Sequence, residues 1–198
     1  MIRFVQLHSE DMKVLIIDNF DSFTYNLVHL ITPLCEDYEV WRNDEIDFSR
    51  VSNFDKILIS PGPGMPKESN QLVDFIARFA EEKDILGICL GCQALGEYFG
   101  AKLYNLEEVK HGVQTPISIL DHSILFKGMP DSINVGRYHS WALNIKHAES
   151  LLPTSLDAAA VLMSFRHKRL PIYGIQFHPE SIMTSQGRFL IENWIQFK

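Results

Sequence analysis

The chain has 198 residues, of which 46% are hydrophobic and 22% are charged, a balance that is typical of a globular domain and excludes wholesale disorder. Its 18 basic and 25 acidic residues give a formal net charge of −7, which argues against nucleic acid or an anionic membrane as the main partner. The longest apolar run, at 158–163, is far too short for a membrane helix, residues 1–12 carry no secretory signal, and three cysteines are too few for a disulfide scaffold. We therefore expect a cytoplasmic protein with free thiols.

Short apolar runs in the first half predict buried strands of a mostly parallel central sheet with helices on both faces. These runs lie at 14–17, 40–41, 57–59 and 85–89. Between them, residues 23–31 and 72–79 carry apolar side chains at helical spacing, and strands that alternate with helices are typical of an α/β domain. The first strand begins just after Met12, so we expect residues 1–11 to be an N-terminal appendage and residues 12–198 to form a single domain.

The second half is strand-like with few helical interruptions, which predicts a small antiparallel extension of the sheet. The strand-like runs lie at 117–120, 133–138, 158–165 and 172–177. A final helix is expected over 185–197, and its apolar side chains indicate the buried face. These side chains are Phe189, Leu190, Trp194 and Phe197.

Cys89 lies where a predicted buried strand runs into a predicted helix, between Gly87 and Gly91. Gly-x-Cys-x-Gly at such a turn has the form of a nucleophile elbow with sulfur in place of serine oxygen. The start of the following helix favours negative charge and so favours the thiolate. A buried structural cysteine between two packing glycines remains an equal alternative from these residues alone.

His178 is the candidate general base for this cysteine. It follows a predicted buried strand, and such strand ends are where open α/β sheets place functional groups. In extended backbone, residues two apart share a side, so Glu180 can accept a hydrogen bond from one ring nitrogen and direct the other toward a thiol. The alternative is a surface turn with a solvated carboxylate.

The segment 60–64, SPGPG, follows another predicted strand. Glycines let bare backbone approach a ligand, so the N–H groups of this segment can line an oxyanion site. Taken alone, the segment is a weak signal, because a purely structural turn is the more frequent explanation of such a sequence. No Gly-Lys-Ser/Thr follows, so it is not a phosphate-binding loop.

Taken together, these segments resemble the class I, triad-type glutamine amidotransferases, in particular the small subunits that serve chorismate-using synthases. The resemblance covers residues 13–197, and its motifs stand in the same order. They are DNFDSFTYNL at 18–27, SPGPG at 60–64, GICLGCQ at 87–93, GRYHSW at 136–141 and QFHPES at 176–181. It implies a flavodoxin-like α/β fold for the whole domain.

The resemblance also implies roles for individual residues. Cys89 resembles the nucleophile, His178 the general base and Glu180 the acid that orients it. Gly62 and the backbone N–H of Leu90 resemble the oxyanion hole. The residues that resemble the glutamine-binding set are Gly62, Pro63, Gly64, Gln93, Ser140 and Trp141.

The implied reaction is hydrolysis of glutamine to glutamate, with ammonia passed to a separate chorismate-binding synthase subunit, component I, in a heterodimer or heterotetramer. We take p-aminobenzoate synthase, which makes 4-amino-4-deoxychorismate, as the first interpretation and anthranilate synthase as the alternative. A γ-glutamyl cysteine hydrolase and a non-catalytic relative are more remote alternatives. No metal or cofactor is expected, because the cysteines and histidines lack a zinc-ligand spacing.

Three places depart from the usual pattern of the family, and one of them is Ser69-Asn70, where Ala-Gly is common. Cys92 stands where histidine or methionine is usual, and Val113 where lysine is often found. We expect Cys92 to face packing atoms in the first helical turn, with a thiol pKa near its ordinary value. Val113 lies in a segment that could touch the synthase, so its effect falls on the interface and not on glutaminase chemistry.

Overall fold

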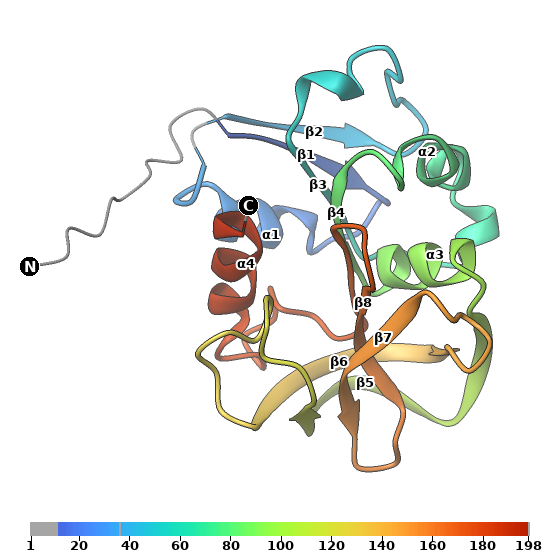
Figure 1. The fold of residues 1–198 in the computed structure, drawn as a ribbon, viewed down its shortest axis with the longest axis vertical. Coiled ribbons are helices and arrows are strands. Elements are labelled where there is room, and N and C mark those ends of the chain that lie inside the picture. Colours follow the sequence, from blue (N-terminus) through green and yellow to red (C-terminus); the bar gives the residue numbers. More distant parts are fainter. Residues whose placement is uncertain (1–11, 36, 198) are drawn as a thin grey trace, which may run out of the picture.

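The computed structural model describes residues 12–35 and 37–197, so the expected appendage at 1–11 lies outside the described residues. The described part forms one nine-stranded mixed sheet in the order β2-β1-β3-β4-β9-β8-β7-β5-β6 (Figure 1). A parallel half is joined to an antiparallel half through β9. This arrangement confirms the predicted α/β architecture with a C-terminal antiparallel extension.

The parallel half holds five strands and is covered on both faces. Its strands are β1 (Lys13–Asp18), β2 (Asp37–Arg42), β3 (Lys56–Ile59), β4 (Asp84–Ile88) and β9 (Ile172–Ile175). The helices are α1 (Thr24–Ile31), α2 (Leu72–Phe79), α3 (Leu90–Tyr98) and α4 (Gly187–Gln196). In β1, Val14 and Ile16 pack on the face that carries α1 and α4, while Leu15 and Ile17 pack on the face of α2 and α3. All four side chains are fully buried, because successive residues of a strand point to opposite covered faces.

The antiparallel half differs in detail from the sequence prediction. Its strands are β5 (Lys102–Ile119), β6 (Ser132–Asn144), β7 (Leu151–Asp157) and β8 (Leu162–His167). The single strand predicted at 158–165 is wrong, since 158–161 is a turn between β7 and β8. The Asp157 carboxylate accepts hydrogen bonds from the backbone N–H groups of Ala159 and Val161, both 2.9 Å long, and Ala160 has φ 59°. An aspartate thus makes the turn without glycine or proline to mark it.

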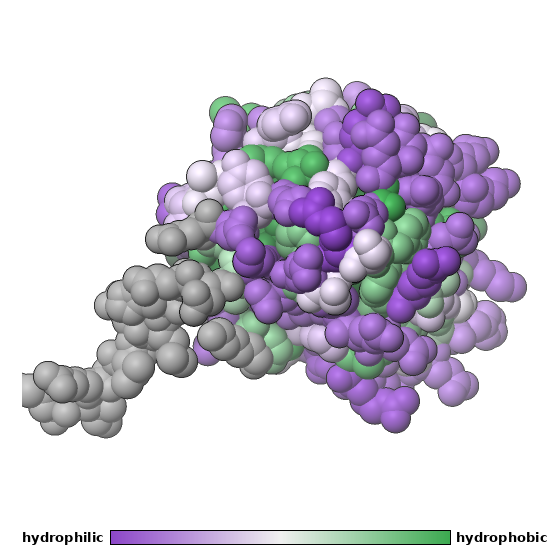
Figure 2. Space-filling model, turned by 90° about the horizontal axis from the view of Figure 1, so that it is seen from above, coloured by the Kyte–Doolittle hydropathy of each residue, from purple (hydrophilic) through white to green (hydrophobic). Residues whose placement is uncertain are grey.

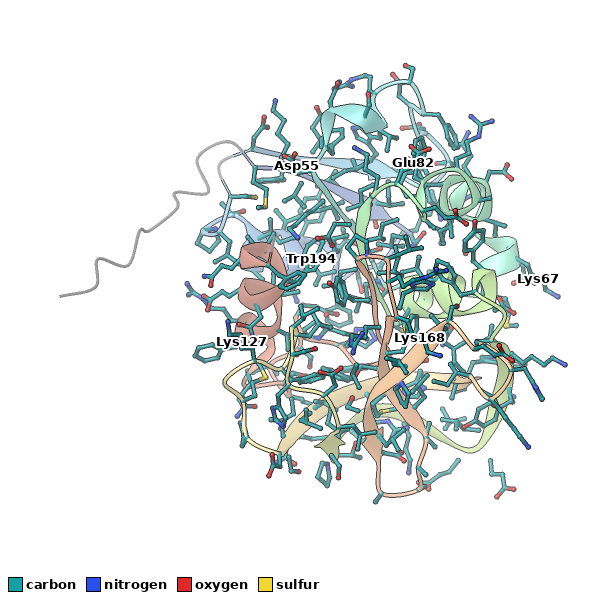
Figure 3. All side chains as sticks on the ribbon, in the orientation of Figure 1. Asp55, Lys67, Glu82, Lys127, Lys168 and Trp194 are labelled. Atoms are coloured by element: carbon teal, nitrogen blue, oxygen red, sulfur yellow. The ribbon has the colours of Figure 1, made fainter. Side chains whose placement is uncertain are left out.

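The predicted final helix exists, but two of its predicted buried side chains are exposed. Phe189 is 60% exposed and Phe197 40% exposed. The buried face is formed by Leu190, Ile191, Trp194 and Ile195. Phe189 precedes this stripe by one residue, a rotation of about 100° on a helix, and Phe197 lies beyond the last helical turn. Trp194 projects from α4 toward the sheet (Figure 3).

No helix in the described part of the chain is long and apolar enough to span a membrane. The face in Figure 2 is largely hydrophilic, with hydrophobic patches between polar side chains.

The carboxyl ends of four strands, β1, β3, β4 and β9, meet at one edge of the sheet, because paired parallel strands end on the same side. β1 leads there into the segment beginning at Asn19, β3 into the segment beginning at Ser60, and β4 into Cys89. β9 leads into Gln176 and His178. The predicted functional segments therefore lie along the same edge.

Candidate active site

Cys89 occupies a tight turn between β4 and α3. Its backbone has φ 50° and ψ −102°, a left-handed conformation that costs a non-glycine residue on the order of 1–3 kcal/mol. The flanking glycines permit the turn: a Cβ on Gly87 would lie 2.5 Å from the Gly91 carbonyl, and one on Gly91 would lie 2.6 Å from the Ile59 carbonyl oxygen. Strain that the surrounding structure holds in place is characteristic of functional sites. The geometry favours a nucleophile elbow over a merely structural cysteine.

Cys89 is buried, with 7% of the residue exposed, and its thiol has a polar neighbour. The Cys89 N–H donates to the Ile175 carbonyl over 2.8 Å, which ties the turn to the end of β9. The side-chain Nε2 of Gln176 donates to the Cys89 Sγ over 3.7 Å. Because α3 begins at Leu90, the free N–H groups of its first turn also favour negative charge at this place.

His178 and Glu180 form a buried pair. The ring Nδ1 of His178 donates to the Glu180 Oε1 over 2.5 Å, with both side chains no more than 4% exposed. The other ring nitrogen, Nε2, is buried beside Cys89 and has no hydrogen-bond partner of its own among the described residues. Burial lowers the pKa of His178, but Cys89 and Glu180 outweigh it, so the pKa lies well above its usual value. The arrangement of a thiol, an imidazole and a carboxylate is that of a nucleophile, its base and an orienting acid.

The SPGPG segment lies against the start of α3. A Cβ on Gly62 would come within 2.7 Å of the Leu90 Cδ2 and 2.5 Å of the Asn19 Cβ, so only glycine permits this approach. Asn19 holds the segment with two hydrogen bonds to Ser60, from its backbone N–H (2.9 Å) and from its side-chain Nδ2 (2.8 Å). Gly62 and Leu90 are thus neighbours next to Cys89.

The other residues of the resemblance lie around the same edge. Gln93 donates through Nε2 to the Trp141 carbonyl over 3.2 Å, which joins α3 to β6. Ser140 and Trp141 are half-buried on β6, and Pro63 and Gly64 are exposed in the SPGPG segment.

Several neighbours of the site were missed by the sequence analysis. The Tyr138 ring lies 4.9 Å from the His178 ring, and the Tyr138 hydroxyl contacts the Ser181 hydroxyl at 3.1 Å. Gln176, Arg137 and His139 are buried next to predicted site residues. All of them stand inside motifs that the resemblance had used. Only their side-chain contacts, made between distant elements, indicate that they belong to the site.

Cys92 faces the interior as expected, but its thiol differs from the prediction. It is 1% exposed, and burial together with the nearby Cys89 holds its pKa well above the ordinary value. An ordinary thiol pKa was therefore a wrong expectation, because the first turn of α3 is covered by the sheet and not by solvent.

The chain is similar to known proteins over most of its length. The sequence family described as "Glutamine amidotransferase class-I" matches residues 15–197. A Haemophilus influenzae protein provisionally described as anthranilate synthase component II is 43% identical over 185 residues, covering 93% of this chain and 96% of that protein. Anthranilate synthase component 2 of Helicobacter pylori is 42% identical over 197 residues, covering 94% and 97%.

A solved structure has the same fold. It is a Thermoplasma acidophilum protein provisionally described as one of the subunits of GMP synthase, with a TM-score of 0.85 and 28% identity. The match covers 95% of this chain and 94% of that one.

Proposed function

Because the chain belongs to the class I glutamine amidotransferases, enzymes that use a Cys-His-Glu triad, we propose that Cys89, His178 and Glu180 are its triad. The observation that carries the proposal is the buried His178–Glu180 pair, whose remaining ring nitrogen lies beside a cysteine on strained backbone. Glu180 accepts from Nδ1 and so leaves Nε2 to exchange a proton with the substrate and with water.

The reaction proceeds through a thioester. The Cys89 thiolate attacks the side-chain amide carbon of glutamine, and the carbonyl oxygen becomes an oxyanion. His178 donates its proton to the departing nitrogen as the C–N bond breaks, which releases ammonia and leaves a γ-glutamyl thioester. His178 then takes a proton from water, whose oxygen attacks the thioester and releases glutamate and the Cys89 thiolate.

The oxyanion is stabilised by the backbone N–H groups of Gly62 and Leu90, which belong to neighbouring segments beside Cys89. The glutamine backbone end is held by a set of residues at the same edge of the sheet. This set is Gly62, Pro63, Gly64, Gln93, Ser140 and Trp141. The Gln93–Trp141 hydrogen bond supports this assignment, because it keeps α3 and β6 together on one side of the thiol.

The ammonia passes to a chorismate-aminating synthase subunit, component I, in a heterodimer or heterotetramer. The relatives from Haemophilus influenzae and Helicobacter pylori carry the description of anthranilate synthase component II or 2. Their similarity over nearly the whole chain favours the tryptophan branch over the p-aminobenzoate interpretation preferred from the sequence.

The test is to mix the chain with each candidate synthase and identify the product. With the anthranilate partner, glutamine and chorismate we expect anthranilate. In the Cys89→Ala complex, amination from glutamine should vanish while amination from added ammonium salts remains, because only the source of ammonia is removed.

Two outcomes would contradict the proposal. Formation of 4-amino-4-deoxychorismate alone would favour the folate branch instead. Loss of both glutamine-dependent and ammonium-dependent amination in an assembled Cys89→Ala complex would contradict the proposal that this chain only supplies ammonia and the synthase carries out the amination.

A further inference from the structure

A continuous line of hydrogen bonds connects a buried ion pair to the sulfur of Cys89. Arg137 Nη1 donates to Asp157 (2.6 Å), Arg137 Nε to His139 Nε2 (3.1 Å), and His139 Nδ1 to the Trp141 carbonyl (2.8 Å). Gln93 Nε2 donates to that same carbonyl (3.2 Å) and to Gln176 Oε1 (3.1 Å), and Gln176 Nε2 donates to Cys89 Sγ (3.7 Å). Each of the four side chains between Asp157 and Cys89 is at most 5% exposed, so water does not compete for these bonds.

The direction of each bond follows from two groups with fixed roles, the Arg137 guanidinium and the Trp141 carbonyl. A guanidinium can only donate, so His139 must accept at Nε2 and carry its proton on Nδ1. Burial, followed by the nearby Arg137 and His178, lowers the pKa of His139 to about 4, although its bond to the Trp141 carbonyl acts in the opposite direction. The ring is therefore neutral at physiological pH and can take this role.

The Trp141 carbonyl can only accept, and this orients the two amides that follow. Gln93 must present its nitrogen to the carbonyl, and the second proton of that nitrogen needs an acceptor. Gln176 therefore presents its oxygen to Gln93, which leaves its own nitrogen facing Cys89. The reverse orientation would set two N–H groups against each other and direct an oxygen lone pair at the sulfur.

We propose that Gln176 is a further catalytic residue, which stabilises the Cys89 thiolate through its side-chain N–H and is oriented for that task by Gln93 and the Trp141 carbonyl. The bond acts on the thiolate that begins the reaction and on the thiolate that leaves when the thioester is hydrolysed. The inference rests on the proposed function only in taking Cys89 as the nucleophile.

Two variants separate the donor from the rest of the side chain. Gln176→Glu keeps an oxygen for Gln93 but removes the N–H that faces Cys89, while Gln176→Met removes both groups at similar size. Gln196→Met, an exposed residue near the end of α4, is the matched control. The readout is the rate of iodoacetamide alkylation at Cys89, followed by peptide mass spectrometry from pH 5 to 10 on the full chain without glutamine.

We expect the midpoint of the alkylation profile to move to higher pH by about one unit in Gln176→Met and further in Gln176→Glu, so that alkylation at a fixed lower pH is roughly tenfold slower. The control should match the wild type. In glutaminase assays, kcat should fall with little change in KM, and the loss should shrink as pH rises, which a merely structural role would not produce.

The proposal would be overturned if the wild type and folded Gln176→Met gave the same alkylation profile. Gln176→Met alone is sufficient for this test if the buried charge in Gln176→Glu prevents that variant from folding. The alkylation readout needs no turnover. The alkylation result therefore does not depend on the proposed function. The proposed function has its own test, because it is contradicted if Cys89→Ala retains glutaminase activity.

Discussion

Cys89 and Cys92 lie three residues apart at the start of α3, but their surroundings differ sharply. Cys89 stands on strained backbone beside His178 and accepts a hydrogen bond from Gln176. Cys92 is enclosed by the sheet, and a Cβ on Gly174 would lie 2.8 Å from its sulfur. The two thiols are therefore expected to differ in reactivity, although they are close in sequence.

A glutamine analogue that carries a reactive diazoketone, diazo-oxonorleucine, should label Cys89 and leave Cys92 unmodified. Burial and Cys89 hold the pKa of Cys92 well above its ordinary value, so this thiol stays protonated at neutral pH. Peptide mapping of the inactivated protein checks this result, and an adduct found on Cys92 alone would contradict the assignment.

His139 should make the stability of the protein depend on pH. Its pKa is lowered to about 4 in the folded chain, chiefly by burial, whereas an unfolded chain has the ordinary value near 6.5. Between these values only the unfolded chain takes up the proton, so stability is lost as pH falls from about 6.5 to 4, by at most about 1.4 kcal/mol per pH unit.

The measurement is urea unfolding of the wild type and His139→Gln across this range. Glutamine can still accept from Arg137 and donate to the Trp141 carbonyl, so it keeps the contacts but does not titrate. The wild type should lose stability relative to the variant as pH falls. Parallel curves would show that His139 does not act as argued.

At the scale of elements, the end opposite the site is held by a buried ion pair that joins β3, β4 and α4. Lys56 on β3 pairs with Asp84 on β4 and also donates to the Phe197 carbonyl over 2.9 Å. Trp194 donates from its indole nitrogen to Asp84 over 2.8 Å. Burial raises the pKa of Asp84, although Lys56 and Trp194 act in the opposite direction.

Lys56→Met should destabilise the fold by about 3–5 kcal/mol, because it leaves the Asp84 carboxyl buried without its cation. Adding Asp84→Asn should recover part of the loss. Lys13→Met, which breaks the solvent-exposed pair with Asp37, is the control and should change little. Urea unfolding measures all of these, and equal effects of the two lysine substitutions would contradict the argument.

At the scale of the whole molecule, large apolar side chains remain exposed around the edge of the sheet that carries the site. Ile182 is 97% exposed just after the triad segment, Tyr25 is 65% exposed on α1, and Phe23 packs beside His178 at 6.4 Å between ring centroids. In the proposed function, ammonia is released at Cys89 and passes from this edge to the synthase subunit. The proposed synthase partner explains an apolar rim here.

Ile182→Asp should weaken assembly with the synthase partner by at least about tenfold in Kd, because a charge would be buried at the interface. Glutamine hydrolysis by the isolated chain should be unchanged. Leu120→Asp, an exposed position just beyond β5, is the matched control. Titration calorimetry or gel filtration measures assembly. If Ile182→Asp binds the synthase partner with unchanged affinity, this edge of the sheet is not part of the interface.

The sequence analysis did not predict where the strands of the antiparallel half begin and end, and the reason is local. β5 runs over 18 residues with register shifts against β6, and most of its side chains are exposed. Residues 102–116 therefore lack an apolar run like the one that predicted a strand at 117–120. The turn between β7 and β8 is made by hydrogen bonds to Asp157 within a run of alanines. Such elements are stabilised by their partners and not by their own residue pattern.

The sequence by itself determined the parallel half of the sheet, the strand ends that bear Cys89, Gly62 and His178, and the resemblance to class I glutamine amidotransferases, because apolar runs and turn residues act over a few positions. Only the tertiary structure decided what surrounds those residues. Gln176 reaches Cys89 across 87 positions and Gln93 reaches Trp141 across 48, so no local pattern could indicate these bonds. Their direction depends on the Trp141 carbonyl, which can only accept, and on the Arg137 guanidinium, which can only donate. These groups come into one buried line because α3 packs against β6 and because the segment after β9 is joined to β6 by the hydrogen bond from the His178 N–H to the Gly136 carbonyl.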